Sequence, residues 1–425
     1  MKEQLLHFIW QYKLYNTKDL TTINGEKLQI INAGKLNRDG GPDFLNATIK
    51  IDDIKLIGNI ELHIHASDWK KHLHQQDKKY SNVILHVVYF NEWQHPIIPT
   101  LELNGRIPTI LLSKYNTLLQ QTKNLACQHL FADINTITLN NWKERLVIER
   151  LERKSNEILY HLKKNNNDWE QTFYQLLGKY FGCHINQEIF EKLTTLLDYK
   201  ILLKHKNDIT QIEALLFGVA GFLNKDFIEI YPRKLKSEFT FLKQKYQLQL
   251  LHEHQWQLLR MRPISFPTIR IAWFAQLIQS FPLLNKIVEN PNDFSWLDDI
   301  EPSEYWNTHY TFDKLSKFKH KQIGNSFKSV IKTNVISPIL FAYGKFYKDE
   351  KLIEQALQIL QQTSFEANHK TNKYDNNFWN KKTGFDAQAL IELNDNYCTK
   401  QRCLDCAIGY QILKNTTHTA LPIIA

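Results

Sequence analysis

The sequence predicts an α+β fold, with a mixed sheet near the N-terminus followed by a mostly α-helical region. Strand signals dominate between an opening helix and about residue 135, and apolar residues recur at helical spacing after it. The 425 residues, of which 43% are hydrophobic, are enough to bury a sizeable core. We therefore expect an α+β domain with a metal site over residues 1–135 and a mostly helical domain with a C-terminal cysteine motif over residues 136–425.

The first domain shows turn signals between β-rich runs. After an amphipathic opening helix, Asn24-Gly25 predicts a hairpin turn, and Asp52-Asp53 predicts the turn of a second hairpin. Pro108 is expected to open a helix that ends near residue 122. The expected strands of this domain span residues 44–51, 54–65, 83–90 and 99–103.

The arm 54–65 alternates with a period of two, so Glu61, His63 and His65 share one face. If Asp52-Asp53 is a two-residue turn, Asp43 lies opposite residue 62 and diagonal to Glu61 and His63. Such a cluster is costly to bury unless a metal or a partner compensates it. The alternative is the polar, solvent-facing side of an antiparallel sheet.

Pro42-Asp43 followed by Glu61-Leu62-His63 resembles the PD-(D/E)XK nuclease pattern, in which Pro-Asp begins one strand of a hairpin and Glu-x-Lys lies on the next. The resemblance implies a PD-(D/E)XK-like core in which Asp43 and Glu61 bind Mg²⁺ or Mn²⁺. This chain has His63 where that family has Lys. Because an unperturbed His, with a pKa near ~6.5, is mostly neutral at neutral pH, we expect His63 to act as a general base or a ligand.

Six of the 17 histidines fall between residues 63 and 95. Ser67-Asp68 predicts the N-cap of a short helix over about 69–80, on which His74 and Asp77 would be i,i+3 neighbours. Asp68 directly follows the strand and is expected at the site. The candidate supporting residues, either metal or phosphate contacts or ordinary surface residues, are His72, His74, Asp77, Tyr80 and His86.

The run GGPDF and the later run GNIELHIHASDWKKHLHQQDKKYSNVILHVVY resemble the signature of a bacterial family catalogued as domain of unknown function 2851. Further runs similar to this family are LLFGVAGFL, RPISFPTIRIAWFA, NVISPILFAYG and YCTKQRCLDCAIG. The resemblance spans nearly the whole chain. It implies membership of the family but no particular chemistry, because no activity is assigned to it.

The formal net charge of +9 favours a polyanionic partner such as nucleic acid, because Lys and Arg neutralise phosphates. No run reaches the roughly 18 apolar residues that a membrane helix needs, so no membrane partner is expected. The opening helix lacks the continuous apolar core of a signal peptide. We therefore expect a cytoplasmic protein, and five cysteines fit a reducing compartment.

In the helical region, basic residues cluster beside aromatic residues at Arg260, Arg262 and Arg270. Arg270 falls within an otherwise apolar helix and would need an acidic or a phosphate partner if buried. We therefore expect either an interdomain ion pair or a phosphate contact. The expected helices span residues 139–163, 168–181, 186–205, 209–223, 233–250, 267–288, 323–348 and 350–362.

Three of the five cysteines form the motif Cys398-x4-Cys403-x2-Cys406, whose second half has metal-site spacing. A fourth ligand must come from elsewhere, and Cys127 is the first choice. Cys183 and His418 are weaker choices. Zinc and an iron–sulfur cluster both accept such ligands. A similar layout occurs in a few nuclease families that resemble PD-(D/E)XK enzymes, whereas the alternative is free thiols or redox use.

The function expected from these residues is metal-dependent hydrolysis of phosphodiester bonds in DNA or RNA. Asp43 and Glu61 would bind Mg²⁺ or Mn²⁺, which polarises the phosphate and activates water. His63 would orient or deprotonate that water, supported by His65 or Asp68. One alternative is a zinc- or iron-dependent hydrolase of a small molecule that uses the histidines as ligands. The other is a noncatalytic binding or scaffold protein.

Overall fold

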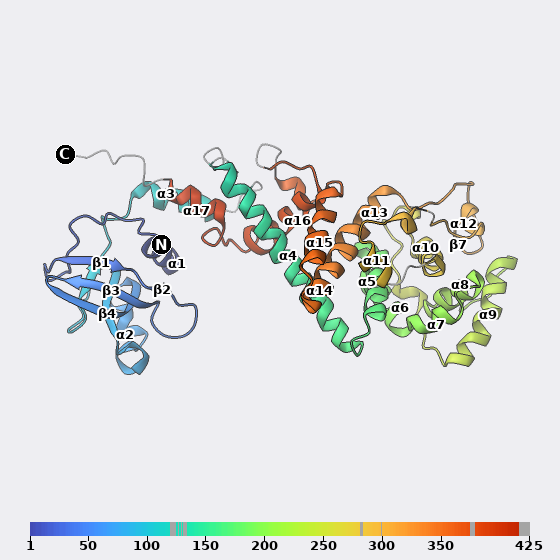
Figure 1. The fold of residues 1–425 in the computed structure, drawn as a ribbon, viewed down its shortest axis with the longest axis horizontal. Coiled ribbons are helices and arrows are strands. Elements are labelled where there is room, and N and C mark those ends of the chain that lie inside the picture. Colours follow the sequence, from blue (N-terminus) through green and yellow to red (C-terminus); the bar gives the residue numbers. More distant parts are fainter. Residues whose placement is uncertain are drawn as a thin grey trace. The chain divides into compact units, whose positions relative to one another are not determined.

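A mixed sheet forms the centre of the N-terminal part of the chain (Figure 1). The structure, a computed structural model, describes residues 1–119, 125, 127–128, 130, 134–280, 284–298, 300–374 and 379–415. The strands are β1 (Leu28–Asn32), β2 (Lys35–Leu36), β3 (Phe44–Ile51), β4 (Ile54–His65), β5 (Val83–Phe90) and β6 (Thr100–Glu102). Their order is β1-β3-β4-β5-β6, with β2 also paired to β3. The first pairings are antiparallel, whereas β4, β5 and β6 run parallel to one another.

The predicted hairpin is confirmed at its turn. Ile51 pairs with Ile54 across Asp52-Asp53. Asp52 has a positive φ of 47°, which is typical of the two-residue turns that join twisted strands. The three predicted strands over 44–51, 54–65 and 83–90 coincide with β3, β4 and β5.

A β-bulge in β3 then changes the register. Phe44 pairs with Ile60, whereas the register set by the turn would pair it with Glu61. Asn46, which lies in the bulge between Phe44 and Ala47, adopts a left-handed φ of 57°. Continuing the ladder by one residue places Asp43 level with Glu61. The prediction that Asp43 lies opposite residue 62 is therefore wrong, because an unbulged hairpin was assumed.

The opening helix α1 (Glu3–Gln11) packs against β4. Its buried side chains are Leu5, Leu6, Phe8, Ile9 and Trp10, which recur at helical spacing on one side. Glu3 and His7 lie on the same helix face, one turn apart. The helix therefore brings two ionisable side chains towards the sheet.

The predicted helix over residues 69–80 is wrong. The segment contains α2 (Asp68–Lys71), followed by two short 3₁₀ turns, η1 (His74–Gln76) and η2 (Lys78–Tyr80). Leu73 takes a left-handed φ of 57° between them, a conformation that ends a right-handed helix. His74 and Asp77 are thus not neighbours on one helix face.

The chain divides into two compact units. Unit 1 comprises Met1–Trp142 together with Leu393–Ala425, and unit 2 comprises Lys143–Glu392. In unit 1, α3 (Thr109–Leu119) contacts α17 (Ala407–Lys414), which follows the cysteine motif. The motif was expected in the second domain, but it belongs to the same unit as the sheet.

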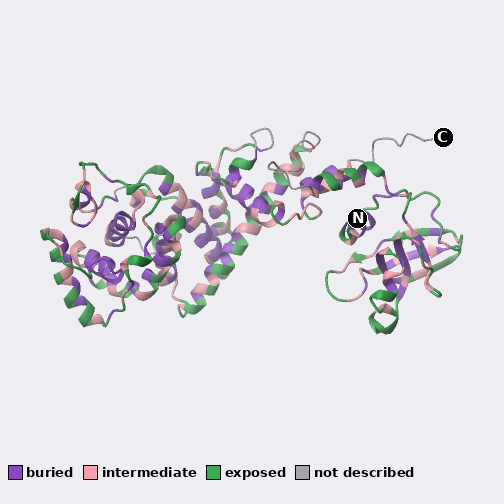
Figure 2. Cartoon of the chain, turned by 180° about the vertical axis from the view of Figure 1, so that it is seen from behind, coloured by how far each residue is buried: buried purple, intermediate pink, exposed green. Residues whose placement is uncertain are grey.

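Unit 2 is helical apart from a two-stranded sheet. Helices α8 (Ile209–Val219) and α10 (Pro267–Ser280) are buried along most of their length (Figure 2), and α10 contacts both α8 and α5 (Trp169–Phe181). The other elements are α4 (Thr136–Lys164, which begins in unit 1), α5 (Trp169–Phe181), α6 (Cys183–Leu196), α7 (Tyr199–Lys204), α8 (Ile209–Val219), α9 (Ile230–Tyr246), η4 (Glu253–Gln255), η5 (Pro263–Ser265), α10 (Pro267–Ser280), α11 (Leu284–Glu289), η6 (Ser295–Leu297), α12 (Tyr305–Thr308), β7 (His309–Thr311), β8 (Lys314–Leu315), α13 (Asn325–Ile331), η7 (Lys332–Ile336), α14 (Ser337–Tyr347), α15 (Glu350–Gln362), η8 (Thr371–Lys373) and α16 (Gly384–Leu393). The π-helical turn η9 (Asn394–Cys398) then leads into the cysteine motif of unit 1. None of the described helices is both long and apolar enough to cross a membrane.

Most predicted helices occur, but three of them are divided. The stretch 186–205 is α6 and α7, and 323–348 is α13 and α14 joined by the π-helical turn η7. The stretch 267–288 is α10 and α11, and its residues 281–283 lie outside the described residues, as do residues 120–122 of the helix opened by Pro108.

Candidate metal centre

The loop before β3 fixes the position of Asp43. The Asn37 backbone N–H donates to the Asp43 carbonyl oxygen at 2.7 Å, and the Asn37 side-chain amide donates to the Pro42 carbonyl oxygen at 3.0 Å. The Asp43 carboxylate in turn accepts a hydrogen bond from the Leu62 N–H at 2.9 Å. A short polar loop therefore holds this carboxylate over β4.

Glu61 is buried beside Asp43. Only 4% of it is exposed, and its Oε2 accepts from the Asp43 N–H at 3.1 Å. Its Oε1 lies 3.2 Å from His74 Nε2 and 3.7 Å from His63 Nε2. Burial, followed by the negative charge of Asp43, raises the pKa of Glu61 to about 9. This part of the face is therefore not the solvated sheet surface that was the alternative prediction.

Four imidazoles continue the site from Glu61. His63 Nδ1 lies 2.9 Å from His86 Nε2, and His63 Nε2 lies 3.3 Å from His72 Nδ1. Among the described residues, His63, His72 and His74 are a group whose ligand atoms all lie within 4.8 Å of one another. Burial, and then the neighbouring imidazoles, lower the pKa of His63 to about 2 and that of His86 to about 3. Both rings are therefore neutral, which is the form that binds metals.

Two residues of α1 complete the site, and the sequence interpretation missed them. His7 Nε2 lies 3.2 Å from Asp43 Oδ2. Burial, and to a smaller extent the negative charge of Asp43, raise the pKa of Glu3, whereas His7 and His72 lower it. Glu3 therefore lies among these groups. Their i,i+4 spacing on an amphipathic helix was the signal available, but nothing in the sequence relates that helix to β4.

Aromatic side chains pack around the imidazole cluster. Tyr80 stacks on His74 with ring centroids 3.9 Å apart. The buried Trp69 ring lies edge-on to His74 at 5.4 Å and to His86 at 5.2 Å. These contacts restrict the rotamers of His74 and His86.

The remaining predicted residues of this region lie around the cluster. Asp68 accepts hydrogen bonds from the His65 N–H at 3.3 Å and from Lys71 Nζ at 2.7 Å, which lower its pKa despite partial burial. His65 is half exposed and lies 3.7 Å from Glu92. Asp77 is exposed and caps η2 by accepting from the Lys79 N–H. His65 and Asp77 are therefore placed at the edge, whereas Asp68 is close enough to act on the charge of His63.

The arrangement fits a divalent transition metal. Two ligands bound tetrahedrally at ~2.05 Å lie about 3.3 Å apart. Glu61 Oε1 lies at similar distances from His74 Nε2 (3.2 Å) and His63 Nε2 (3.7 Å), as does His63 Nε2 from His72 Nδ1 (3.3 Å). His86 would orient His63 from behind. Within the described part of the chain, no Lys or Arg forms an ion pair with Asp43 or Glu61, so the two carboxylates lack a fixed counter-charge.

The three arginines predicted to bind phosphate belong to unit 2. Arg260 and Arg262 are exposed. Arg270 is buried, with its guanidinium 4.2 Å from the centroid of Phe327 and 4.9 Å from that of Trp273. No described carboxylate pairs with Arg270, so the expected ion pair is not found among the described residues; aromatic faces surround the charge instead.

Cys127, Cys398, Cys403 and Cys406 all belong to unit 1, although about 270 residues separate the first from the others. Cys183 begins α6 in unit 2 and is not part of this group. His418 lies outside the described residues. Cys127 and the C-terminal motif thus belong to one unit and Cys183 to the other, and the choice of Cys127 as the fourth ligand stays a prediction.

No curated protein and no solved structure matches the chain. The family described as "Protein of unknown function (DUF2851)" matches residues 3–369, which is most of the chain. The chain therefore belongs to this family.

Proposed function

We propose that this protein is a metal-dependent phosphodiesterase that acts on nucleic acid, with its metal at the Asp43, Glu61 and histidine cluster. The observation that carries the proposal is the placement of two carboxyl residues side by side. The N–H of Asp43, just before β3, donates to Glu61 on β4, and Glu61 lies 3.2 Å from His74 and pairs with no described Lys or Arg. Burying these groups together is costly unless a cation compensates them.

The ligand set favours Mn²⁺ or another transition metal over Mg²⁺. Mg²⁺ prefers oxygen ligands in a near-octahedral arrangement, whereas imidazole suits Zn, Fe and related ions. Such an ion polarises a phosphate and lowers the pKa of bound water. His63, Glu61 and His74 would hold it, and Asp43 offers a second carboxylate beside it.

A phosphate-bearing substrate is supported by Lys79. A methyl group added at Gly40 would lie 3.6 Å from Lys79 Nζ, so this ammonium group lies against the loop that carries Asp43. The PD-(D/E)XK-like spacing of Asp43 and Glu61 and the net charge of +9 support the same substrate class. In this proposal Lys79 supplies the positive charge that His63 does not.

The second candidate is a zinc- or iron-dependent hydrolase of a small molecule. Its specific support is the group of three imidazoles, a ligand set that catalytic zinc sites use with water in the open position. It predicts that Lys79→Ala leaves turnover unchanged, because no phosphate backbone has to be held.

The deciding experiment measures cleavage of labelled single-stranded, double-stranded and branched DNA and RNA in Mn²⁺, Mg²⁺ and Zn²⁺. We expect cutting in Mn²⁺ that Glu61→Gln reduces at least 100-fold, since the variant removes a charged ligand with little change in shape. Glu92→Gln is the matched control, because Glu92 is partly exposed and contacts Ser67 and His65 at the edge. If Glu61→Gln cuts as fast as wild type, or if metal-loaded wild type cuts none of the substrates, the proposal fails.

A further inference from the structure

Four cysteines converge in unit 1 from two distant parts of the chain. The Cys127 thiol is buried, and burial raises its pKa; Cys398, Cys406 and Cys403 raise it further. Charges act in this way only between groups that lie close together. Four of the five cysteines of the chain thus lie within charge-interaction range of one another, and no disulfide joins them.

The end of α3 connects the two parts. Cys403 Sγ donates to the Leu118 carbonyl oxygen at 3.7 Å, and the Gln401 side chain donates to the Leu119 carbonyl oxygen at 3.3 Å. These two carbonyls end the helix from which the chain continues to Cys127. The cysteine motif is therefore held against the end of α3, eight residues before the fourth cysteine.

The backbone around the motif is tightly turned. Gln401 takes a left-handed φ of 53° between Cys398 and Cys403. At Gly409 a Cβ atom would lie 2.1 Å from the Cys403 carbonyl oxygen, so only glycine permits the close approach. Burial raises the pKa of Cys406 to about 12, although the N–H groups of Gly409 and Ile408 that reach its sulfur partly oppose this rise.

We propose that Cys127, Cys398, Cys403 and Cys406 bind a [4Fe–4S] cluster that closes unit 1. A single zinc ion at ~2.3 Å from each sulfur requires sulfurs about 3.8 Å apart. Among the described residues, no three of these thiols form a set with all sulfurs within 4.8 Å, although Cys127 lies within charge-interaction range of the other three. A cubane cluster suits wider spacing, because each thiolate binds a different iron.

The role of the cluster is structural and needs no electron transfer. It cross-links residue 127 to residues 398–406, two segments that the backbone connects only through the whole of unit 2. A cross-link that closes so long a loop limits the unfolded chain strongly. Because the cluster lies on cysteines and the proposed phosphodiester site on carboxylates and imidazoles, either proposal can fail without the other.

The test is the iron and acid-labile sulfide content of the full chain purified without oxygen, together with its visible absorption. We expect about four irons and four sulfides per chain, with a thiolate-to-iron charge-transfer band. Cys127→Ser and Cys406→Ser should each lower both contents at least several-fold, whereas Cys183→Ser and Glu61→Gln should retain them. If Cys127→Ser does not fold, the sulfide content of wild type still decides. Zinc without sulfide, iron without sulfide, or no metal at all would overturn the cluster.

Discussion

Glu61 shows what a bound cation would change in the candidate metal centre. Its carboxyl group is buried. Burial and the Asp43 carboxylate destabilise the charged form of Glu61 by more than the hydrogen bond from the Asp43 N–H stabilises it. With a pKa of about 9, the metal-free site holds a proton on Glu61 at neutral pH. A bound divalent ion would replace that proton.

Proton release should therefore accompany metal binding. At pH 7, Mn²⁺ is expected to displace about one proton per chain, from Glu61, and almost none from His63, whose pKa of about 2 leaves it already neutral. Since the proton competes with the metal below pH 9, apparent affinity should rise about tenfold per pH unit between pH 6 and pH 8. Titration calorimetry in two buffers of different ionisation enthalpy measures the release. Equal release from wild type and Glu61→Gln would contradict the assignment.

The sequence identified the residues of the sheet better than those that come from elsewhere. Asp43, Glu61 and His63 were predicted because a period of two relates neighbours on one strand and pairing relates two strands. Glu3 and His7 were missed because their approach depends on how α1 packs against β4. Pattern and spacing describe local structure, whereas this contact is tertiary.

At the scale of elements, the bulge in β3 sets the alignment of the two carboxylates. Asn46 sits in the left-handed region, where a β-branched residue is strained and glycine is not. Asn46→Val is expected to destabilise unit 1 by about 1–2 kcal/mol and to weaken Mn²⁺ binding by moving Asp43 out of line with Glu61. Asn46→Gly, the matched control, should bind Mn²⁺ as wild type does. Thermal unfolding with and without Mn²⁺ measures both effects, and equal behaviour of the two variants would refute the role of the bulge.

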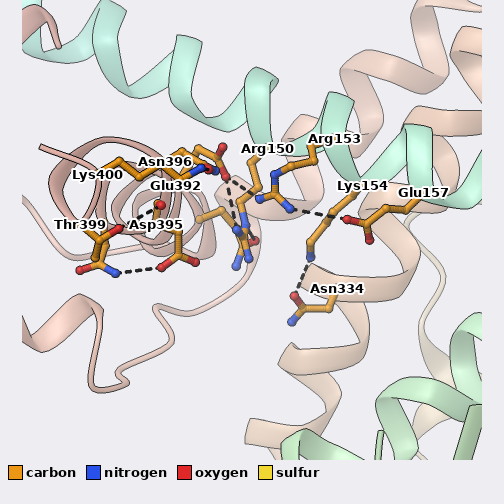
Figure 3. Close-up of polar contacts among 12 residues, drawn as sticks. Arg150, Arg153, Lys154, Glu157, Asn334, Glu392, Asp395, Asn396, Thr399 and Lys400 are labelled. Atoms are coloured by element: carbon orange, nitrogen blue, oxygen red, sulfur yellow. Dashed lines mark hydrogen bonds and ion pairs between the residues drawn. The ribbon is translucent and has the colours of Figure 1, made fainter. Parts of the chain in front are cut away.

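A second element-scale feature is the polar row on α4 (Figure 3). Arg153 reaches Glu392 at 2.7 Å, and the next residue, Lys154, donates to Asn334 of the π-helical turn η7 at 2.7 Å. Burial, and then the charges of Arg150 and Arg153, lower the pKa of Lys154 well below its usual value. The buried amine thus depends on the Asn334 carbonyl group.

Asn334→Leu should therefore remove the acceptor of the hydrogen bond that Lys154 donates, and lower the free energy of unfolding of unit 2 by about 1–3 kcal/mol. Adding Lys154→Met, which replaces the amine with an apolar chain of similar length, should recover most of that loss. Denaturant unfolding of the two single variants and the double variant measures the coupling. Strictly additive effects would show that the two side chains do not depend on each other.

The sequence predicted where elements occur more reliably than where they break. Helices such as α5 and α15 follow from apolar periodicity that runs without interruption. The break at Leu73 could not be predicted, because no Gly or Pro marks it. The π-helical turn at 332–336 did have a local signal, because Pro338 follows it and lacks the N–H that would donate to Asn334. The break at Leu73 is therefore imposed by tertiary packing over local preference.

At the scale of the whole molecule, the sequence order of the two units differs from their spatial grouping. The last described segment completes unit 1: Tyr410 of α17 lies 5.9 Å from Phe8 and 4.6 Å from Tyr12, and Arg38 pairs with Asp405 at 3.1 Å. No local sequence pattern indicates that the C-terminal segment packs against the N-terminal residues of unit 1. The cysteine motif was therefore expected with the helical domain. Unit 1 therefore cannot be complete before the C-terminal segment is present.

Unit 1 should consequently depend on residues that lie more than 250 positions after its sheet. Ile412 of α17 is buried, and Ile412→Asn is expected to cost unit 1 about 2–4 kcal/mol, because it removes apolar contacts and buries an amide. Lys414→Gln, on the exposed side of the same helix, should change stability by less than about 0.5 kcal/mol. Scanning calorimetry should show Ile412→Asn lowering the transition that Mn²⁺ raises, while the transition lowered by Asn334→Leu stays in place. If Ile412→Asn instead lowered only the transition that Asn334→Leu lowers, α17 would stabilise the helical unit, and the division of the chain would have to be redrawn.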